Sequence, residues 1–217
     1  MCSNDKIKYF EELLSFAVGG KAEEEAKRIL STFVSNTDIA SSGSEILQNL
    51  SGCSEQSADF ITLMAAISSR RVTDEFKPGR KYSTSEIERY VCALLFHLSV
   101  ESVYMISFNQ SGKLIASDLL TEGTINSSAF LPRKMADIAI RRKAASVILA
   151  HNHPSGNPLP SDNDVSVTLL AESVLRDAHV KLDAHYITVG FNIHDCLLDI
   201  KAMIGRKENV SRVNPIA

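Results

Sequence analysis

The sequence predicts an α/β (α+β) fold, in which a sheet domain flanked by helices follows a small all-helical domain. Two patterns support this prediction. Across residues 6–71 the apolar side chains recur at helical spacing, whereas from about residue 101 short β-rich segments alternate with helical ones. Mixed strands and helices in this order are typical of a sheet covered by helices. Because 44% of the residues are hydrophobic, the chain can also form a substantial core.

The N-terminal domain, residues 1–75, is predicted to contain four helices. Their expected ranges are 6–18, 22–33, 44–50 and 55–71. Glycines at Gly19-Gly20 and at Gly52 are expected to end the first and third helices. In the fourth helix we expect five apolar side chains to point largely inward: Ala58, Ile61, Leu63, Met64 and Ile67. Residues 76–83, which include Lys77-Pro78-Gly79-Arg80, are predicted to form a linker.

Residues 84–217 form the predicted sheet domain. A helix is expected over residues 84–98, because a Ser/Thr cap stands beside Glu86 and Glu88 at its start. Strands over 102–108 and 113–120 are joined by turn-forming residues. The elements expected after them are a helix from Pro132 to about 143, a strand over 145–150, a helix from Ser161 to about 177, and a strand over 182–189.

Composition argues against several classes of protein. No stretch approaches the roughly 20 apolar residues of a membrane helix, and the N-terminus lacks the apolar segment of a signal peptide. The four cysteines have no C-x-x-C spacing, which suggests free thiols in a reducing cytoplasm. Residues 1–80 hold 9 basic and 12 acidic side chains, and the remainder holds 14 of each. Neither part is a basic nucleic-acid footprint, so DNA binding is only weakly supported.

One segment concentrates metal-binding side chains. His151-Asn152-His153 directly follows a short apolar strand, and residues at i and i+2 of an extended chain point to the same side. Two imidazoles aimed at one point are a natural beginning of a zinc site. The Pro- and Gly-rich loop 154–160 can turn the chain back, so Asp164, in the first turn of the next helix, can reach the same point. Three protein ligands plus water is the arrangement of a catalytic zinc.

Each part of this pattern also has a purely structural interpretation. Most histidines bind no metal, and Ser161 with Asp164 has the spacing of a helix capping box. An acid in the first helical turn is favoured by the helix dipole without any ligand. The whole combination, H-x-H at a strand end, a tight loop, and S-x-x-D opening a helix, is more specific than its parts and favours the metal site.

The same residues resemble a known family. H-x-H, seven residues and then S-x-x-D is similar to the JAMM signature of JAB/MPN-domain metalloproteases. The fuller string H-N-H-P-S-G-x-P-x-P-S, beginning at His151, resembles the RadC-like branch, as do residues 122–128 and Pro132-Arg133. The resemblance covers about 84–205 strongly and 1–75 more weakly. It implies a JAB/MPN-like mixed β-sheet with one zinc ion, held by His151, His153 and Asp164, and a protein or peptide substrate whose amide or isopeptide bond is hydrolysed.

The family also uses an upstream glutamate as general base. Glu86, Glu88, Glu101 and Glu122 are the acids that compete for this role, and the resemblance points to Glu101, just before the strand over 102–108. Its structural alternative is a surface acid beside a strand. In the chemistry that the resemblance implies, zinc lowers the pKa of its bound water to about 7. The glutamate would then take the water's proton and pass it to the leaving amine.

Three further residues near the motif receive weaker predictions. Ser161 matches the family's serine, whose hydroxyl could stabilise an oxyanion, although a capping role is equally open. Asn152 and the loop 154–160 are expected along the path of a substrate. His185 matches a histidine of the RadC-like branch, but the Asp that usually precedes it is replaced by Ala184, so the resemblance assigns it no role.

The N-terminal domain resembles a degenerate helix-hairpin-helix. Gly52 stands where the first hairpin glycine is expected, and Ser54 replaces the second. Such hairpins bind phosphate through backbone N–H groups that glycines leave accessible. The missing glycine and the acidic balance weaken a DNA-binding role and favour a domain that packs or contacts a protein partner. Two alternatives to a hydrolase remain: an accessory protein of DNA repair or recombination, and a scaffold without metal.

Overall fold

The computed structural model describes residues 3–123 and 130–203, and the chain divides into two compact units. Unit 1 comprises residues 1–75 with 93–99, and unit 2 comprises residues 76–92 with 100–217, within the described ranges. Strands and sheet-covering helices occur in unit 2, behind a helical N-terminal region, which confirms the predicted α/β fold class. Residues 124–128, part of the segment that resembles the RadC-like branch, and the C-terminal residues 204–217 lie outside the described ranges.

Unit 1 is built from short helices around a small core. Its elements are α1 (Ser3–Val18), the 3-10 turn η1 (Gly19–Lys21), α2 (Ala22–Thr32), α3 (Asn36–Ser41), α4 (Ser44–Ser51) and α5 (Glu55–Thr73). The four predicted helices are present, and α3 was not predicted. It is only six residues long and begins with a capping box in which Ser35 and Asp38 bond each other's backbone N–H. The core of unit 1 includes the fully buried side chains of Leu14, Ile29 and Leu47.

The prediction for α5 was wrong for three of its five apolar residues. Ala58 is fully buried and Ile61 packs against the core, but Leu63, Met64 and Ile67 are exposed by 57%, 39% and 53%. The buried residues of α5 are small side chains on one helical face, such as Ala65 and Ser69, so Leu63, Met64 and Ile67, one or two positions from Ala65, point outward.

Unit 2 contains a five-stranded mixed sheet in the order β2-β1-β3-β4-β5. The strands are β1 (Ser102–Phe108), β2 (Leu114–Glu122), β3 (Ser146–Asn152), β4 (Lys181–Val189) and β5 (Asn192–Asp195). All neighbours are antiparallel except β3 and β4, which are parallel and joined by α8 (Asp162–Asp177). This parallel pair matters for the site, because both strands end at the same edge of the sheet as the N-terminus of α8. The four-residue β5 was not predicted.

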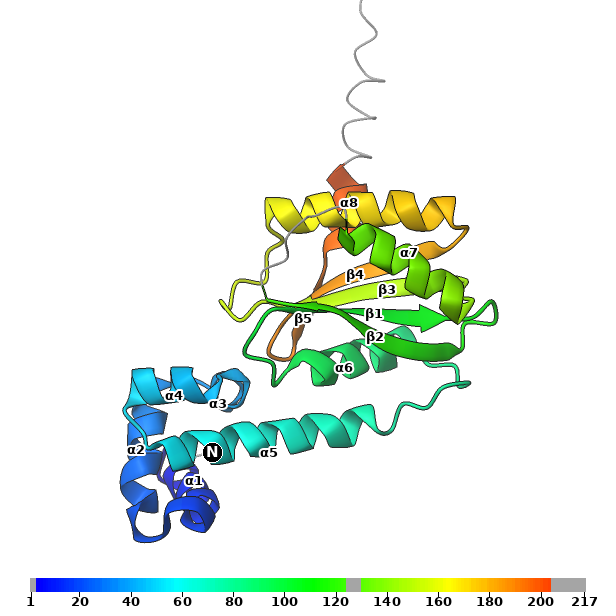
Figure 1. Ribbon diagram of the computed structural model, residues 1–217. Helices are drawn as coiled ribbons and strands as arrows, with labels where there is room; N and C mark the ends of the chain where they lie inside the picture. The colour runs from blue at the N-terminus through cyan, green and yellow to red at the C-terminus, as the bar shows by residue number, and fades with distance from the viewer. Residues whose placement is uncertain (1–2, 124–129, 204–217) are drawn as a thin grey trace, which may run out of the picture. The chain divides into compact units, whose positions relative to one another are not determined.

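Helices cover both faces of this sheet (Figure 1). α7 (Phe130–Arg142) and α8 lie on one face, over a core that includes the fully buried Met105, Met135 and Leu149. α6 (Thr84–Leu95) lies on the other, where the hydroxyl of Tyr90 is 2.7 Å from that of Ser117 on β2. Each large apolar side chain buried in this way contributes about 1.5–3 kcal/mol. The two helical layers therefore hold the sheet, and with it the ends of β1 and β3, in a fixed geometry.

The segment predicted as a linker also packs on unit 2. Phe76 is buried, and its ring lies 4.7 Å from Tyr82 and 4.8 Å from Tyr90, centroid to centroid. The N–H of Gly79 donates to the carbonyl of Leu114, and the N–H of Leu114 donates to the carbonyl of Arg80. Residues 76–82 are thereby attached to the beginning of β2.

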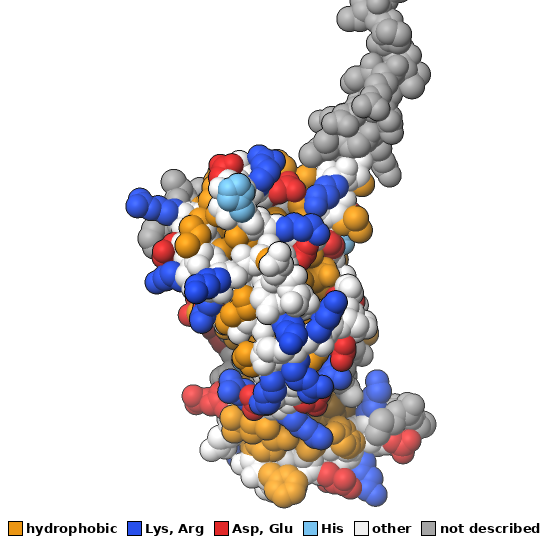
Figure 2. Space-filling view, turned by 90° about the vertical axis from the view of Figure 1, so that its right-hand side faces the viewer, with side chains coloured by type: hydrophobic (Ala, Val, Ile, Leu, Met, Phe, Trp, Pro, Cys, Tyr) orange, Lys and Arg blue, Asp and Glu red, His pale blue; other side chains and the backbone are white. Residues whose placement is uncertain are grey.

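The surface carries charges of both signs. On the face seen in Figure 2, Lys and Arg side chains are interspersed with acidic, neutral and hydrophobic ones. None of the described helices is both long and apolar enough to cross a membrane. Cys53, Cys92 and Cys196 are buried free thiols, as predicted, and Cys2 lies outside the described residues.

Candidate metal centre

The end of β3 presents two histidines to one point. His151 is the sixth residue of β3 and is fully buried, and His153 follows the strand. The N–H of His153 donates to the carbonyl of Thr188, which extends the pairing with β4 by one residue and keeps the chain straight. Because side chains alternate along an extended chain, His151 and His153 face the same way, and their Nε2 atoms are 2.9 Å apart.

Helix α8 supplies the carboxylate. Ser161 is its N-cap, and the capping box predicted from the sequence is present: Asp164 and Ser161 bond each other's backbone N–H. This cap holds Asp164 in the first turn, where its side chain is almost completely buried. Its Oδ1 lies 3.2 Å from Nε2 of His151, and its Oδ2 lies 3.4 Å from Nε2 of His153. A capping role and convergence on the histidines therefore coexist in one residue.

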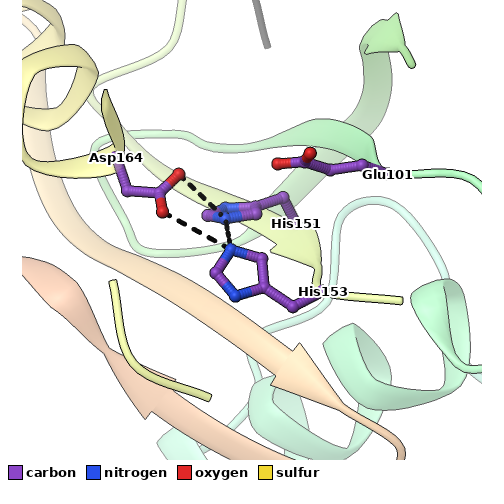
Figure 3. A group of neighbouring side chains, drawn as sticks. All are labelled: Glu101, His151, His153 and Asp164. Atoms are coloured by element: carbon purple, nitrogen blue, oxygen red, sulfur yellow. Dashed lines mark hydrogen bonds and ion pairs between the residues drawn. The ribbon is translucent and has the colours of Figure 1, made fainter. Parts of the chain in front are cut away.

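Glu101 completes the cluster from the beginning of β1. One donor atom each of Glu101, His151, His153 and Asp164 lies within 4.8 Å of the others, and this is the cluster of metal-binding type found among residues 3–123 and 130–203. Figure 3 shows the carboxylates of Glu101 and Asp164 on opposite sides of the histidine rings. The structure therefore brings together all three predicted metal ligands and the predicted general base.

The competing acids lie elsewhere. Glu122 is opposite Ser102 in the β1–β2 ladder and is exposed, outside the cluster. Glu86 bonds the backbone and hydroxyl of Ser83 at the start of α6. Glu88 is also on α6 and is not a member of the cluster.

The electrostatics of the cluster follow from burial and close pairing. Burial by itself would raise the pKa of Asp164, but hydrogen bonds from His151, His153 and Ser161 outweigh it and hold that pKa well below its usual range. The hydrogen bond to Asp164 raises the pKa of His153. Burial raises the pKa of Glu101, and the nearby histidines oppose this shift only in part. The hydrogen bonds therefore favour the anionic form of Asp164, whereas burial favours the protonated form of Glu101.

The donor set fits a divalent metal ion. Two ring nitrogens and a carboxylate converge, which is the combination of ligands that zinc accepts in catalytic sites. The nitrogens of two neutral imidazoles at 2.9 Å would repel each other unless a proton or a cation lies between them. A fourth group, Glu101, lies beside the three predicted ligands. The cluster is thus compatible with binding of a divalent metal ion.

A series of hydrogen bonds supports His151 on the side of its ring that faces away from the cluster. Its Nδ1 is 3.0 Å from Nε2 of His185 on β4, and Nδ1 of His185 is 2.6 Å from the hydroxyl of Thr168 on α8. The Thr168 hydroxyl donates to the backbone carbonyl of Asp164 at 2.5 Å. Complete burial lowers the pKa of His185 to about 3, so the ring is neutral. With a cation in place of a proton at Nε2 of His151, one set of donors satisfies these contacts: Nδ1–H of His151 donates to Nε2 of His185, and Nδ1–H of His185 donates to the Thr168 hydroxyl.

The sequence left the role of His185 in doubt and did not identify Thr168. The doubt rested on the residue before His185, but what matters in the structure is that β4 pairs in parallel with β3, with Leu149 opposite His185. A signal for Thr168 was available, because a threonine four residues after Asp164 falls on the same, buried face of α8.

Ser161 has the capping role that the sequence left open, whereas the environment of Asn152 differs from the one expected. The hydroxyl of Ser161 donates to Oδ2 of Asp164 at 2.7 Å, so it belongs to the support of the cluster. The side chain of Asn152 was expected along the path of a substrate, but it is buried and bonds the backbone at the beginning of β1. Ser155 is exposed in the loop after His153, where the N–H of Gly156 donates to the carbonyl of His153 in a tight turn.

Comparison with known proteins places these residues in a family. The family model described as the RadC-like JAB domain matches residues 82–194, which include Glu101, both histidines and Asp164. The match covers more than half of the chain.

Similar proteins in bacteria extend over most of the sequence. A UPF0758 protein of Cupriavidus pinatubonensis is 28% identical over 179 residues, which are 82% of this chain and 78% of that relative. A UPF0758 protein of Finegoldia magna is 30% identical over 172 residues, 76% of each chain. A UPF0758 protein of Bordetella avium is 35% identical over 127 residues, 58% of this chain and 56% of that relative. The first two similarities extend beyond the matched domain into the N-terminal helical region, since their 179 and 172 aligned residues exceed the 136 residues of 82–217.

Proposed function

This chain belongs to the RadC-like JAB domain family, and on that basis we propose that it is a zinc-dependent hydrolase of the JAMM type that cleaves peptide or isopeptide bonds. The observation that carries the proposal is the convergence of Glu101, His151, His153 and Asp164 within 4.8 Å. In this proposal the two histidines and Asp164 hold one zinc ion, and a protein or peptide is the substrate.

In the proposed reaction the residues of the cluster have separate roles. A bound zinc ion would supply Lewis acidity and lower the pKa of a bound water to about 7. Glu101 accepts the proton of the attacking water, since its carboxylate borders the cluster without belonging to the three ligands. Its raised pKa suits the second half of the reaction, in which it returns the proton to the leaving amine. The anionic Asp164 and the neutral His185 keep the ligand set in its metal-binding protonation state.

Ser161 is proposed to assist at the developing oxyanion. Its hydroxyl donates to a carboxylate oxygen of Asp164, and that oxygen is 3.4 Å from Nε2 of His153. The hydroxyl therefore lies at the border of the cluster. If Asp164 binds a cation, its oxygens accept less strongly, which frees the Ser161 hydroxyl to turn towards a substrate oxygen. We further propose a cytoplasmic location, which the buried free thiols support.

An alternative role in DNA repair has less support from the N-terminal hairpin. The backbone N–H and the hydroxyl of Ser54, at the beginning of α5, both donate to the carboxylate of the buried Glu25, at 2.8 and 3.1 Å. A phosphate-binding hairpin needs such N–H groups free for the ligand. A phosphate that approached this helix end would meet an internal carboxylate. The third possibility, a scaffold without metal, is disfavoured by the intact donor set.

Metal content and cleavage by the purified protein test the proposal. Protein prepared without added metal should contain close to one zinc per chain, and His153→Ala should lose most of it. His194→Ala is a matched control, because His194 belongs to the same unit but pairs with Asp199. A library of peptides and isopeptide-linked substrates then tests hydrolysis. Equal zinc in wild type and His153→Ala would contradict the ligand assignment, and zinc-loaded protein that cleaves no amide bond would contradict the proposed activity.

A further inference from the structure

Asn152, between the two histidines, bonds the backbone on both sides of Glu101. Its Oδ1 accepts the N–H of Ser102 at 2.9 Å, and its Nδ2 donates to the carbonyl of Val100 at 3.1 Å. The Asn152 side chain is 6% exposed, and Ser102 is buried as well. The two peptide units that flank Glu101 are therefore held by one side chain from the strand that carries the histidines.

These two bonds lie just beyond the end of the backbone ladder between β1 and β3. The last paired residues of β1 and β3 at this edge are Val103 and His151, and β1 itself begins at Ser102. A side-chain amide carries one acceptor and a pair of donors, so it can take the place of a peptide group in a ladder. The side-chain amide of Asn152 takes the place of a peptide group and extends the sheet past its last backbone pair. The backbone of Glu101 is therefore held as it would be inside a strand.

The remaining contacts of this segment do not replace the side chain of Asn152. The carbonyl of Glu101 accepts the N–H of Gly123, which holds the segment from the side of β2. The hydroxyl of Ser102 donates to the carbonyl of Val100 within the same segment, so it adds no link to β3. Asn152 thus supplies the side-chain link between the strand of the histidines and the segment of Glu101.

We propose that Asn152 is a positioning residue that fixes Glu101 at the candidate metal centre, and this inference rests on the proposed function. A general base must reach the proton that it removes within about 2.6–3.2 Å. Misplacement of such a group by about 1 Å can cost about 10²-fold in rate. Asn152 stands between the two histidines and also holds Glu101. The three consecutive residues His151-Asn152-His153 therefore set the distance between the proposed metal ligands and the proposed base.

The pair of bonds requires asparagine. Aspartate has the same shape and can accept the N–H of Ser102, but it has no N–H for the carbonyl of Val100. Alanine removes both bonds. Asn109 provides a matched control at the other end of β1: its side chain accepts the backbone N–H groups of Ser111 and Lys113, both at 3.0 Å, in the turn that leads to β2. Asn109→Ala removes bonds of the same kind far from the cluster.

The first test needs no metal and no substrate. Amide hydrogen exchange of the full chain, measured by NMR after chelation, should show the Ser102 N–H protected in wild type. Asn152→Ala should raise its exchange rate by at least about tenfold, because exchange reports local opening of a hydrogen bond. Asn109→Ala should leave Ser102 unchanged and raise exchange at Ser111 and Lys113. An unchanged Ser102 rate in Asn152→Ala would overturn the proposed link.

The second test separates positioning from a general structural role. In the zinc-loaded protein, Asn152→Ala should lower kcat by about 10²-fold and leave zinc affinity within about threefold of wild type. In the Glu101→Gln background the same change should cause no further loss, because its effect passes through Glu101. Equal losses in both backgrounds, or a large loss of zinc affinity, would overturn the inference. If wild type bound no zinc and cleaved nothing, the proposed function would fail, whereas the exchange experiment would still report on the link itself.

Discussion

The Thr168 hydroxyl offers the sharpest test of the chain that supports His151. In Thr168→Val a methyl group of similar size replaces the hydroxyl, so that packing is kept and the polar contacts are lost. The contacts removed are those to Nδ1 of His185 at 2.6 Å, to the carbonyl of Asp164 at 2.5 Å and to the sulfur of Cys196 at 3.6 Å. The ring of His185 then has a buried N–H without an acceptor.

The size of the effect follows from these contacts. Leaving one buried donor unsatisfied costs about 1–3 kcal/mol, and this is the loss that we expect in the free energy of unfolding without metal. His185 would also be free to turn or to take its other tautomer, and Nε2 of His151 would no longer be held unprotonated for the metal. Loss of such a partner typically costs about 10–100-fold in metal affinity. Both effects should appear together, since one hydroxyl carries both.

Two measurements check this reasoning. Urea unfolding in the presence of a chelator gives the free energy of unfolding, and competition with a chromophoric chelator gives zinc affinity. Thr168→Ser is the control, because it keeps the hydroxyl and should retain most of the affinity. If Thr168→Val kept the zinc affinity of the wild type, the proposed role of the hydrogen bonds from His151 through His185 to Thr168 would be refuted. A fall in stability would then reflect lost local contacts alone.

Three further predictions concern the base, the metal and the N-terminal hairpin. Glu101→Gln should retain zinc and melting temperature but lose hydrolysis by about 10²-fold or more, whereas Glu122→Gln, on the exposed end of β2, should do much less; the reverse order in a cleavage assay would reassign the base. Zinc affinity should fall as the pH is lowered through the raised pKa of His153, because a protonated imidazole binds no metal, and an affinity that stays constant in acid would argue against this ligand. DNA binding by the full chain should be weak at physiological salt, and Glu25→Gln should strengthen it if phosphate competes for Ser54; sub-micromolar, salt-resistant anisotropy titrations of the wild type would contradict our interpretation of the hairpin.

Local patterns in the sequence were sufficient for most elements and for the core of the candidate site. The range of β1 was predicted to the residue, and the start of α8 followed from its Ser161 cap. His151, His153 and Asp164 could be grouped because strand alternation and a helix cap are short-range rules, which hold within about fourteen residues of chain. Short elements such as α3 and β5 were missed, because a handful of residues carries too little periodicity to be recognised.

The tertiary structure decided which distant residues support that site, since Glu101 was indicated by the family resemblance and not by its local sequence. Nothing in the local sequence around Glu101, His185 or Asn152 fixes its partners, because each partner comes from another strand or helix through the pairing of β1 and β4 with β3. The sequence by itself was sufficient for most of the secondary structure and for grouping the H-x-H and S-x-x-D side chains. The order of strands in the sheet determined what surrounds them, since register places residues 34 to 52 positions apart within hydrogen-bonding distance.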